Sequence, residues 1–215
     1  MTTDFRRLHD DENADLSAFL HTLSADDWER PSLCDGWRVR DVVGHILYGN
    51  GLKLWTLPYK LGRFRFSSDR SGEHYSILRA EGHPPAQLLD DFDHRNPWAG
   101  TSKVFPARLN LLDRLVHHQD IRRALNRPRE VPIERTAPLL PLLPKLGQVF
   151  RSKERMRGLR FEATDTGWSH GDAGAPVVRG PAEAILMSTL GRGTALADCE
   201  GDGVDVLRKR TNSTQ

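Results

Sequence analysis

Two neighbouring histidines follow an aspartate in the stretch DRLVHHQDIRR, residues 113–123. Residues four apart lie one above the other on a helix, so Asp113 and His117 would project from the same helix face. His118 would point about 100° further round the same helix. A third residue of the same chemical kind, His45, lies within a separate predicted helix. These residue types are those that bind metal ions in proteins.

If the two helices face each other, His45, Asp113 and His117 can converge inside a helical bundle. Two imidazoles and one carboxylate that leave open coordination positions are typical of catalytic zinc and of non-haem iron. Bundles build metal sites in this way, from inward side chains on facing helices. An aspartate and a histidine four residues apart are also a common pair on an ordinary helix surface. The spacing alone leaves both interpretations open.

Other polar residues of the chain are candidates for supporting roles. Asp120 could accept a hydrogen bond from the outer nitrogen of His117 and orient that ring, or it could be a charge partner for Arg123. Guanidinium groups suit carboxylates, so arginines are candidate anchors for a carboxylate or a thiol cofactor. Those that we consider are Arg40, Arg122, Arg123 and Arg192. We predict a catalytic role for Arg192 and a cofactor-binding role for Arg123.

Four segments with apolar residues at helical spacing precede residue 126. We expect helices over 4–23, 38–55, 86–95 and 106–125, because apolar residues recur every three to four positions there. Pro106 opens the last of these, which carries the paired histidines. We interpret residues 59–84, which are basic and aromatic, as a long connection with little regular structure. Four helices with apolar stripes in one domain predict a helical bundle.

The sequence changes character after the fourth predicted helix. Residues 131–150 contain four prolines, which interrupt helices, and predict a connecting segment packed against the bundle. GLRFEATD alternates like a strand, and GWSHGDAGAPVVRG predicts two further strands around a turn. PAEAILMSTLGR predicts a helix, and GDGVDVLRKR predicts a last strand. We therefore expect an α+β chain with a helical domain at 1–150 and a small α+β domain at 151–215.

Length and composition limit the classes of function. The 215 residues carry 31 Lys and Arg against 29 Asp and Glu, a net charge of +2, which demands neither nucleic acid nor an anionic membrane as a partner. Two distant cysteines are a poor framework for secretion, and no apolar run reaches the length of a membrane span. The N-terminus lacks the apolar region of a signal peptide. We expect a cytoplasmic protein, and leave monomer or homodimer open.

Several motifs together resemble one protein family. CDGWRVRDVVGHILYGN, which contains His45, resembles the first hallmark of the mycothiol-dependent maleylpyruvate isomerase family, in which a C-x-G-W motif precedes a helix with a histidine. LLDRLVHHQDIRRALN resembles the second hallmark, E-x-x-x-H-x-x-D followed by two arginines. GLRFEATDTGWSHG, PVVRGPAEAILMSTLGR and GDGVDVLR are similar to the C-terminal domain of that family. The resemblance covers nearly the whole chain, with the motifs in order.

The resemblance implies a fold and a set of metal ligands. The fold would be a DinB-like four-helix bundle followed by a small α/β domain like that of sterol carriers. In the family, the histidine of the first motif and the E-x-x-x-H pair bind a divalent metal, usually zinc. Carried over residue by residue, the ligands are His45, Asp113 and His117. Asp113 stands where the family commonly has a glutamate, whose carboxylate reaches further, and His118 is the fallback ligand.

The resemblance also implies an activity. Family members use mycothiol, a low-molecular-weight thiol, and a bound divalent cation favours the thiolate form. A thiolate can add to a double bond of a small electrophile, allow rotation, and leave again, or the adduct can be released. We therefore expect a metal- and thiol-dependent isomerase or S-transferase. Two alternatives stay open: a metal-dependent hydrolase, which would need no thiol, and a metal-binding protein without catalysis.

Overall fold

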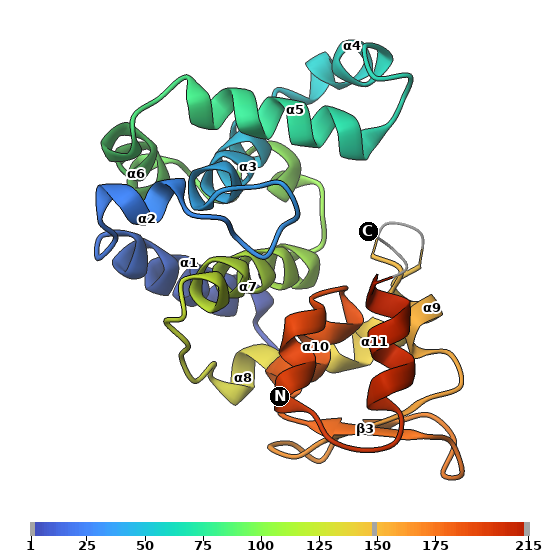
Figure 1. Ribbon diagram of the computed structural model, residues 1–215. Helices are drawn as coiled ribbons and strands as arrows, with labels where there is room; N and C mark the ends of the chain where they lie inside the picture. Colours follow the sequence, from blue (N-terminus) through green and yellow to red (C-terminus); the bar gives the residue numbers. More distant parts are fainter. Residues whose placement is uncertain (1–2, 148–149, 213–215) are drawn as a thin grey trace. The chain divides into compact units, whose positions relative to one another are not determined.

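The chain folds into two compact units, residues 1–129 and residues 130–215. The structure is a computed structural model that describes residues 3–147 and 150–212 (Figure 1). The division lies before the Pro-rich segment, whereas the sequence analysis placed a boundary at residue 150. The reason is that Leu139, Leu140 and Leu143 are fully buried within the second unit, where their segment packs against its helices.

The first unit is built from helices, as the sequence predicts. The four longest are α1 (Phe5–Leu20), α3 (Val39–Gly51), α5 (Ser68–Glu81) and α7 (Ala107–Ala124). Shorter helical segments join them: α2 (Ala25–Glu29), η1 (Leu54–Thr56), α4 (Leu57–Gly62), α6 (Pro85–His94) and η2 (Gly100–Lys103). Within the described ranges, no helix of the chain is long and apolar enough to cross a membrane.

Helix boundaries in this unit follow local chemistry. The Asp4 side chain accepts hydrogen bonds from two backbone N–H groups at the start of α1, which satisfies donors that have no partner within the helix. Ser24 and Asp27 form a reciprocal capping box at α2. Pro106 precedes the first turn of α7, where its fixed φ and missing N–H cost nothing.

The core of the first unit lies where α1, α3, α6 and α7 meet. Helix α1 packs along α7, and α3 contacts α5, α6 and α7 (Figure 1). The buried apolar side chains of this core are Leu16, Phe19, Leu20, Trp28, Val39, Val42, Val43, Ile46, Leu47, Leu88, Phe92, Ile121 and Leu125. This packing fixes α3 against α7, the two helices that carry the candidate metal ligands.

The prediction of an irregular connection over 59–84 is wrong, because most of that segment is helical. Helix α5 packs closely against α3 through small side chains rather than through an apolar stripe. A Cβ added at Gly44 would lie 2.5 Å from the backbone oxygen of Ser76 and 3.0 Å from Cβ of Ala80. Ser76 and Ala80 are both fully buried. Such an interface leaves no apolar period in the sequence for a pattern to reveal.

The second unit combines short helices with a three-stranded sheet. Its elements are α8 (Ile133–Thr136), η3 (Ala137–Lys145), α9 (Ser152–Met156), β1 (Arg160–Ala163), β2 (Ser169–His170), β3 (Val177–Gly180), α10 (Ala182–Thr189), η4 (Gly193–Asp198) and α11 (Val204–Asn212). Strand β1 lies between the other two, antiparallel to β2 and parallel to β3. The three predicted strands after residue 157 and the predicted helix after Gly180 are therefore present.

The predicted last strand is wrong, because residues 204–212 form α11. Val204, Leu207 and Thr211 are buried, and their spacing of three and four residues is that of one helix face. The alternation of Val204 and Val206 with charged residues suggested a strand, but Val206 is only partly buried.

Candidate metal centre

Helices α3 and α7 bring His45, Asp113 and His117 together. Nε2 of His117 lies 3.5 Å from Oδ1 of Asp113, and Nε2 of His45 lies 4.0 Å from the same oxygen. One donor atom from each residue lies within 4.8 Å of the other two. The two rings meet edge to face with centroids 4.9 Å apart. The geometry therefore brings the three residues together as the sequence predicts.

The ring of His45 is held from its outer side by α5. Nδ1 of His45 lies 3.2 Å from Oγ of Ser76, and that hydroxyl donates its proton to the backbone oxygen of Gly72 at 2.6 Å. A hydroxyl has one proton, so Ser76 can only accept from Nδ1–H of His45. The lone pair of the neutral ring is then on Nε2, which faces Asp113. Metal-binding histidines are oriented in this way by a partner at the other nitrogen.

The ring of His117 is held from its outer side within α7. Nδ1–H of His117 donates to Oδ2 of Asp120 at 3.1 Å, and Asp120 is fully buried. The thiol of Cys34 donates to the same carboxylate oxygen at 3.1 Å. This arrangement is the orienting role that the sequence suggested for Asp120.

His118 lies on a different face of α7 and belongs to another network. Its Nδ1 lies 2.7 Å from Oε1 of Glu12, and Nε of Arg122 donates to its Nε2 at 2.8 Å. Because Nε2 accepts, Nδ1 carries the proton of the neutral ring and donates to Glu12. Both nitrogens are occupied on the side of α1, so His118 does not replace Asp113 in this group. Arg122 has a packing role here, since its guanidinium also covers the ring of Phe19.

Charges in the site favour opposite protonation states for its two histidines. Burial and, to a smaller extent, the charge of His117 lower the pKa of His45 to about 4. Burial also opposes a charge on His117, but the carboxylates of Asp113 and Asp120 outweigh it and hold the pKa of His117 well above its usual value. The pKa of Asp113 is lowered, because the attraction of His117 outweighs burial. Without a cation, a second proton on His117 thus offsets one of the two negative charges of Asp113 and Asp120.

The three donor atoms fit a divalent cation, except that the separation between His45 and Asp113 is too wide. Ligands about 2.0–2.1 Å from a tetrahedral zinc ion lie about 3.3 Å from each other. The pair of His117 and Asp113, at 3.5 Å, is close to this value, whereas the pair of His45 and Asp113, at 4.0 Å, is wider. The side chains of His45 and Asp113 are 31% and 45% exposed, which leaves one side of the group open. Asp113 has a side chain one methylene shorter than the glutamate that the family pattern has at this position.

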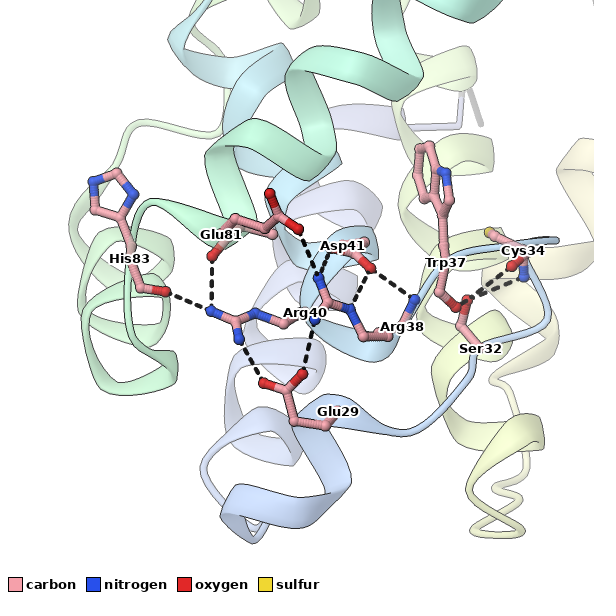
Figure 2. Close-up of polar contacts among 10 residues, drawn as sticks. Glu29, Ser32, Cys34, Trp37, Arg38, Arg40, Asp41, Glu81 and His83 are labelled. Atoms are coloured by element: carbon pink, nitrogen blue, oxygen red, sulfur yellow. Dashed lines mark hydrogen bonds and ion pairs between the residues drawn. The ribbon is translucent and has the colours of Figure 1, made fainter.

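The predicted arginines have different surroundings. Arg40 is engaged at the start of α3, where it contacts Glu29 and the backbone oxygens of Ala80 and His83 (Figure 2). Arg123 lies in the last turn of α7, six residues and thus about 9 Å along the helix axis beyond His117. Arg192 belongs to the second unit and donates to the backbone oxygen of Leu190. The roles predicted for Arg123 and Arg192 stay predictions.

Two supporting residues were not found from the sequence. Ser76, the partner of His45, lies in the segment that we interpreted as irregular, so its position on a helix could not be used. Cys34 contacts Asp120. Its loop lies 86 residues before Asp120 along the chain, and no spacing rule connects the two. Both become visible only when the packing of α3 against its neighbours is known.

Comparisons with known proteins identify similar folds and one matching family model. Residues 9–101 match the family model described as the mycothiol maleylpyruvate isomerase N-terminal domain, a range that includes His45. Two crystal structures are similar to the chain, one of the mycothiol-dependent maleylpyruvate isomerase and one of a histidine-to-alanine mutant of it. Each is 15% identical, with a TM-score of 0.63 over 94% of this chain and 95% of the other. A search of curated proteins found no match.

The fold and the site define a class: an α+β chain whose helical N-terminal unit gathers two histidines and an aspartate at one point. Within this class, residues 9–101 belong to the family of mycothiol maleylpyruvate isomerase N-terminal domains. The predicted fold class is confirmed, since the likeness to the crystal structures extends over nearly the whole chain. At 15% identity this likeness shows a shared fold and nothing about function.

Proposed function

We propose that the protein is a metal-dependent enzyme that uses mycothiol on small electrophiles, by cis–trans isomerisation or by S-transfer. Zinc is the proposed metal, and His45, Asp113 and His117 are its proposed ligands. The observation that carries the proposal is the orientation of both imidazoles, whose outer nitrogens are held by Ser76 and Asp120. Rings held at the outer nitrogen, with the inner nitrogen directed at a shared carboxylate, are the arrangement typical of metal-binding histidines.

A divalent cation at this point would favour the thiolate form of a bound thiol, the nucleophile that the proposed reaction needs. The residues of the chain would hold the cation and orient its ligands. Ser76 and Asp120 keep the inner nitrogens directed at one point, and Asp113 supplies a negative charge there. The ring of Trp37, 5.4 Å from that of His45, packs beside the group. Arg123 is the proposed contact for the thiol cofactor, and Arg192 the proposed anchor for an acidic substrate.

The test measures turnover of maleylpyruvate by the zinc-loaded protein, with and without mycothiol. We expect turnover that requires both the thiol and the metal, and that His45→Ala or His117→Ala removes. His94→Ala is the matched control, because the side chain of His94 is 77% exposed on α6. Turnover without the thiol would favour the hydrolase. Bound zinc with no thiol-dependent turnover of any tested electrophile would favour a metal-binding protein without catalysis.

A further inference from the structure

The outer side of His117 holds a second group of metal-ligating atoms. Sγ of Cys34, Oδ2 of Asp120 and Nδ1 of His117 form a triangle, and all three atoms differ from those of the first group. Its sides are 3.1 Å from sulfur to oxygen, 3.8 Å from sulfur to nitrogen, and 3.1 Å from nitrogen to oxygen. In the structure these atoms are joined by hydrogen bonds.

The loop that carries Cys34 is built to hold the sulfur in place. The hydroxyl of Ser32 donates to the backbone oxygen of Trp37 at 2.9 Å and accepts from the backbone N–H of Cys34 at 3.1 Å (Figure 2). The backbone N–H of Leu33 donates to the backbone oxygen of Asp120 at 3.1 Å. The loop is thus closed on itself and attached to α7 at the residue whose carboxylate Cys34 contacts.

The separations within the triangle are those of a metal site. Zinc lies about 2.3 Å from thiolate sulfur, about 2.0–2.1 Å from imidazole nitrogen and about 2.0–2.2 Å from carboxylate oxygen. With these bond lengths, the three observed separations correspond to angles at the ion of about 90° to 120°. This is the range of a distorted tetrahedral site with one position open. The first group, with its separation of 4.0 Å, needs more adjustment.

The charges of the triangle suit a divalent ion. When such an ion binds, the thiol proton of Cys34 and the Nδ1 proton of His117 pass to solvent, and His117 keeps its other proton on Nε2. One thiolate and one carboxylate then neutralise the two positive charges, which a fully buried Asp120 requires. The thiolate selects soft ions. We propose that Cys34, Asp120 and His117 form a second metal site, selective for thiophilic divalent ions such as Cd²⁺.

The two sites exclude each other because they share one ring. A neutral imidazole has a single lone pair, on Nε2 for the first site or on Nδ1 for the second. An ion at the second site therefore leaves Nε2 of His117 protonated and removes one ligand of the first. A soft metal at Cys34 would displace the metal of the first site, so the chain would be sensitive to thiophilic metals.

The experiment is a Cd²⁺ titration of the full chain, followed by the ultraviolet charge-transfer absorption of a cadmium–thiolate bond. We expect one such band per chain in the wild type and in Cys199→Ser, the control for the other cysteine, and no band in Cys34→Ser. Asp120→Asn should bind Cd²⁺ at least tenfold more weakly, which tests the site with the thiol intact. A band that persists in Cys34→Ser, or unchanged affinity in Asp120→Asn, would overturn the proposal.

His45→Ala separates the two sites, because it removes a ligand of the first and none of the second. The cadmium band should survive in this variant, an outcome that does not depend on the proposed enzymatic activity. Chain loaded with Co²⁺ at the first site should release it as Cd²⁺ binds, and Cys34→Ser should not. Binding of Cd²⁺ without release of Co²⁺ from the loaded wild type would contradict the mutual exclusion.

Discussion

At the scale of single residues, the candidate centre depends on which nitrogen of each histidine carries a proton. Ser76 and Asp120 each accept a hydrogen bond from an outer Nδ1–H, so both Nε2 atoms face inward. The raised pKa of His117 means that its Nε2 must lose a proton before it can bind a metal. The weak point is Asp113, whose carboxylate is 4.0 Å from Nε2 of His45. From the sequence, spacing settles only that Asp113 and His117 share a helix face. The convergence of His45 with them was one of two open interpretations, and the orienting role of Asp120 was one of two alternatives.

Lengthening the carboxylate should improve the first site. Asp113→Glu adds one methylene, and the half-exposed side chain has room for it, so the oxygen can move toward His45. We expect zinc to bind at least tenfold more tightly in isothermal titration. Asp113→Asn, which keeps the shape and removes the charge, should bind at least tenfold more weakly. Weaker binding by Asp113→Glu than by the wild type would show that the separation of 4.0 Å is not the limit.

Removing the partner of His45 should weaken metal binding without touching a ligand. Ser76→Ala leaves Nδ1–H of His45 without its acceptor, and loss of such a partner typically lowers metal affinity about 10- to 100-fold. Ser71→Ala, on the same helix, is the control and should keep the affinity of the wild type. Equal zinc affinity in Ser76→Ala and the wild type would mean that the ring is oriented by something else.

At the scale of elements, the position of α5 against α3 decides whether Ser76 reaches His45. The sequence predicted α1, α3, α6 and α7 because their buried apolar residues recur at helical spacing. It could not predict α5, whose buried face toward α3 includes serine and alanine and whose Leu78 is 54% exposed. Small residues at a helix contact leave no apolar pattern in the sequence, so the contact between Ser76 and His45 could be found only in the structure.

A side chain at Gly44 should separate the two helices. The Cβ of Gly44→Ala would meet the backbone of Ser76, and such overpacking costs about 1–3 kcal/mol, more than the helix propensity gain of about 1 kcal/mol. We expect a lower free energy of unfolding and weaker zinc binding.

Gly72→Ala is the matched control, since nothing lies within 4 Å of a Cβ there. It lies on α5 and should stabilise the protein by up to about 1 kcal/mol. If Gly44→Ala is as stable as Gly72→Ala and binds zinc normally, the close contact does not position Ser76.

At the scale of the whole molecule, buried histidines make stability depend on pH. His9 and His118 are fully buried, and burial lowers the pKa of each to about 4. Between about pH 6.5 and pH 4 the unfolded chain therefore binds more protons than the folded chain, and stability falls as the pH falls. The pKa of His117 is raised, so its contribution is complete below pH 6.5 and is lost only as the pH rises.

Urea unfolding of the metal-free protein at pH 7 and pH 5 measures this effect. We expect the free energy of unfolding to decrease by about 2 kcal/mol each for His9 and His118 over this interval, and His45, whose pKa is also lowered to about 4, adds to the decrease. His9→Gln should show a smaller decrease than the wild type, because one of these groups no longer titrates. The same free energy of unfolding at pH 7 and pH 5 would contradict the burial of neutral histidines.

The central claim is that His45, Asp113 and His117 hold a divalent metal, and the zinc content of the purified chain tests it most directly. It is best measured by elemental analysis in a Cys34→Ser background, so that the proposed second site does not contribute. We predict about one zinc per chain in this background and with added His94→Ala, and none with added His45→Ala or His117→Ala. Equal zinc content in all four proteins, or none in any of them after reconstitution, would contradict the account.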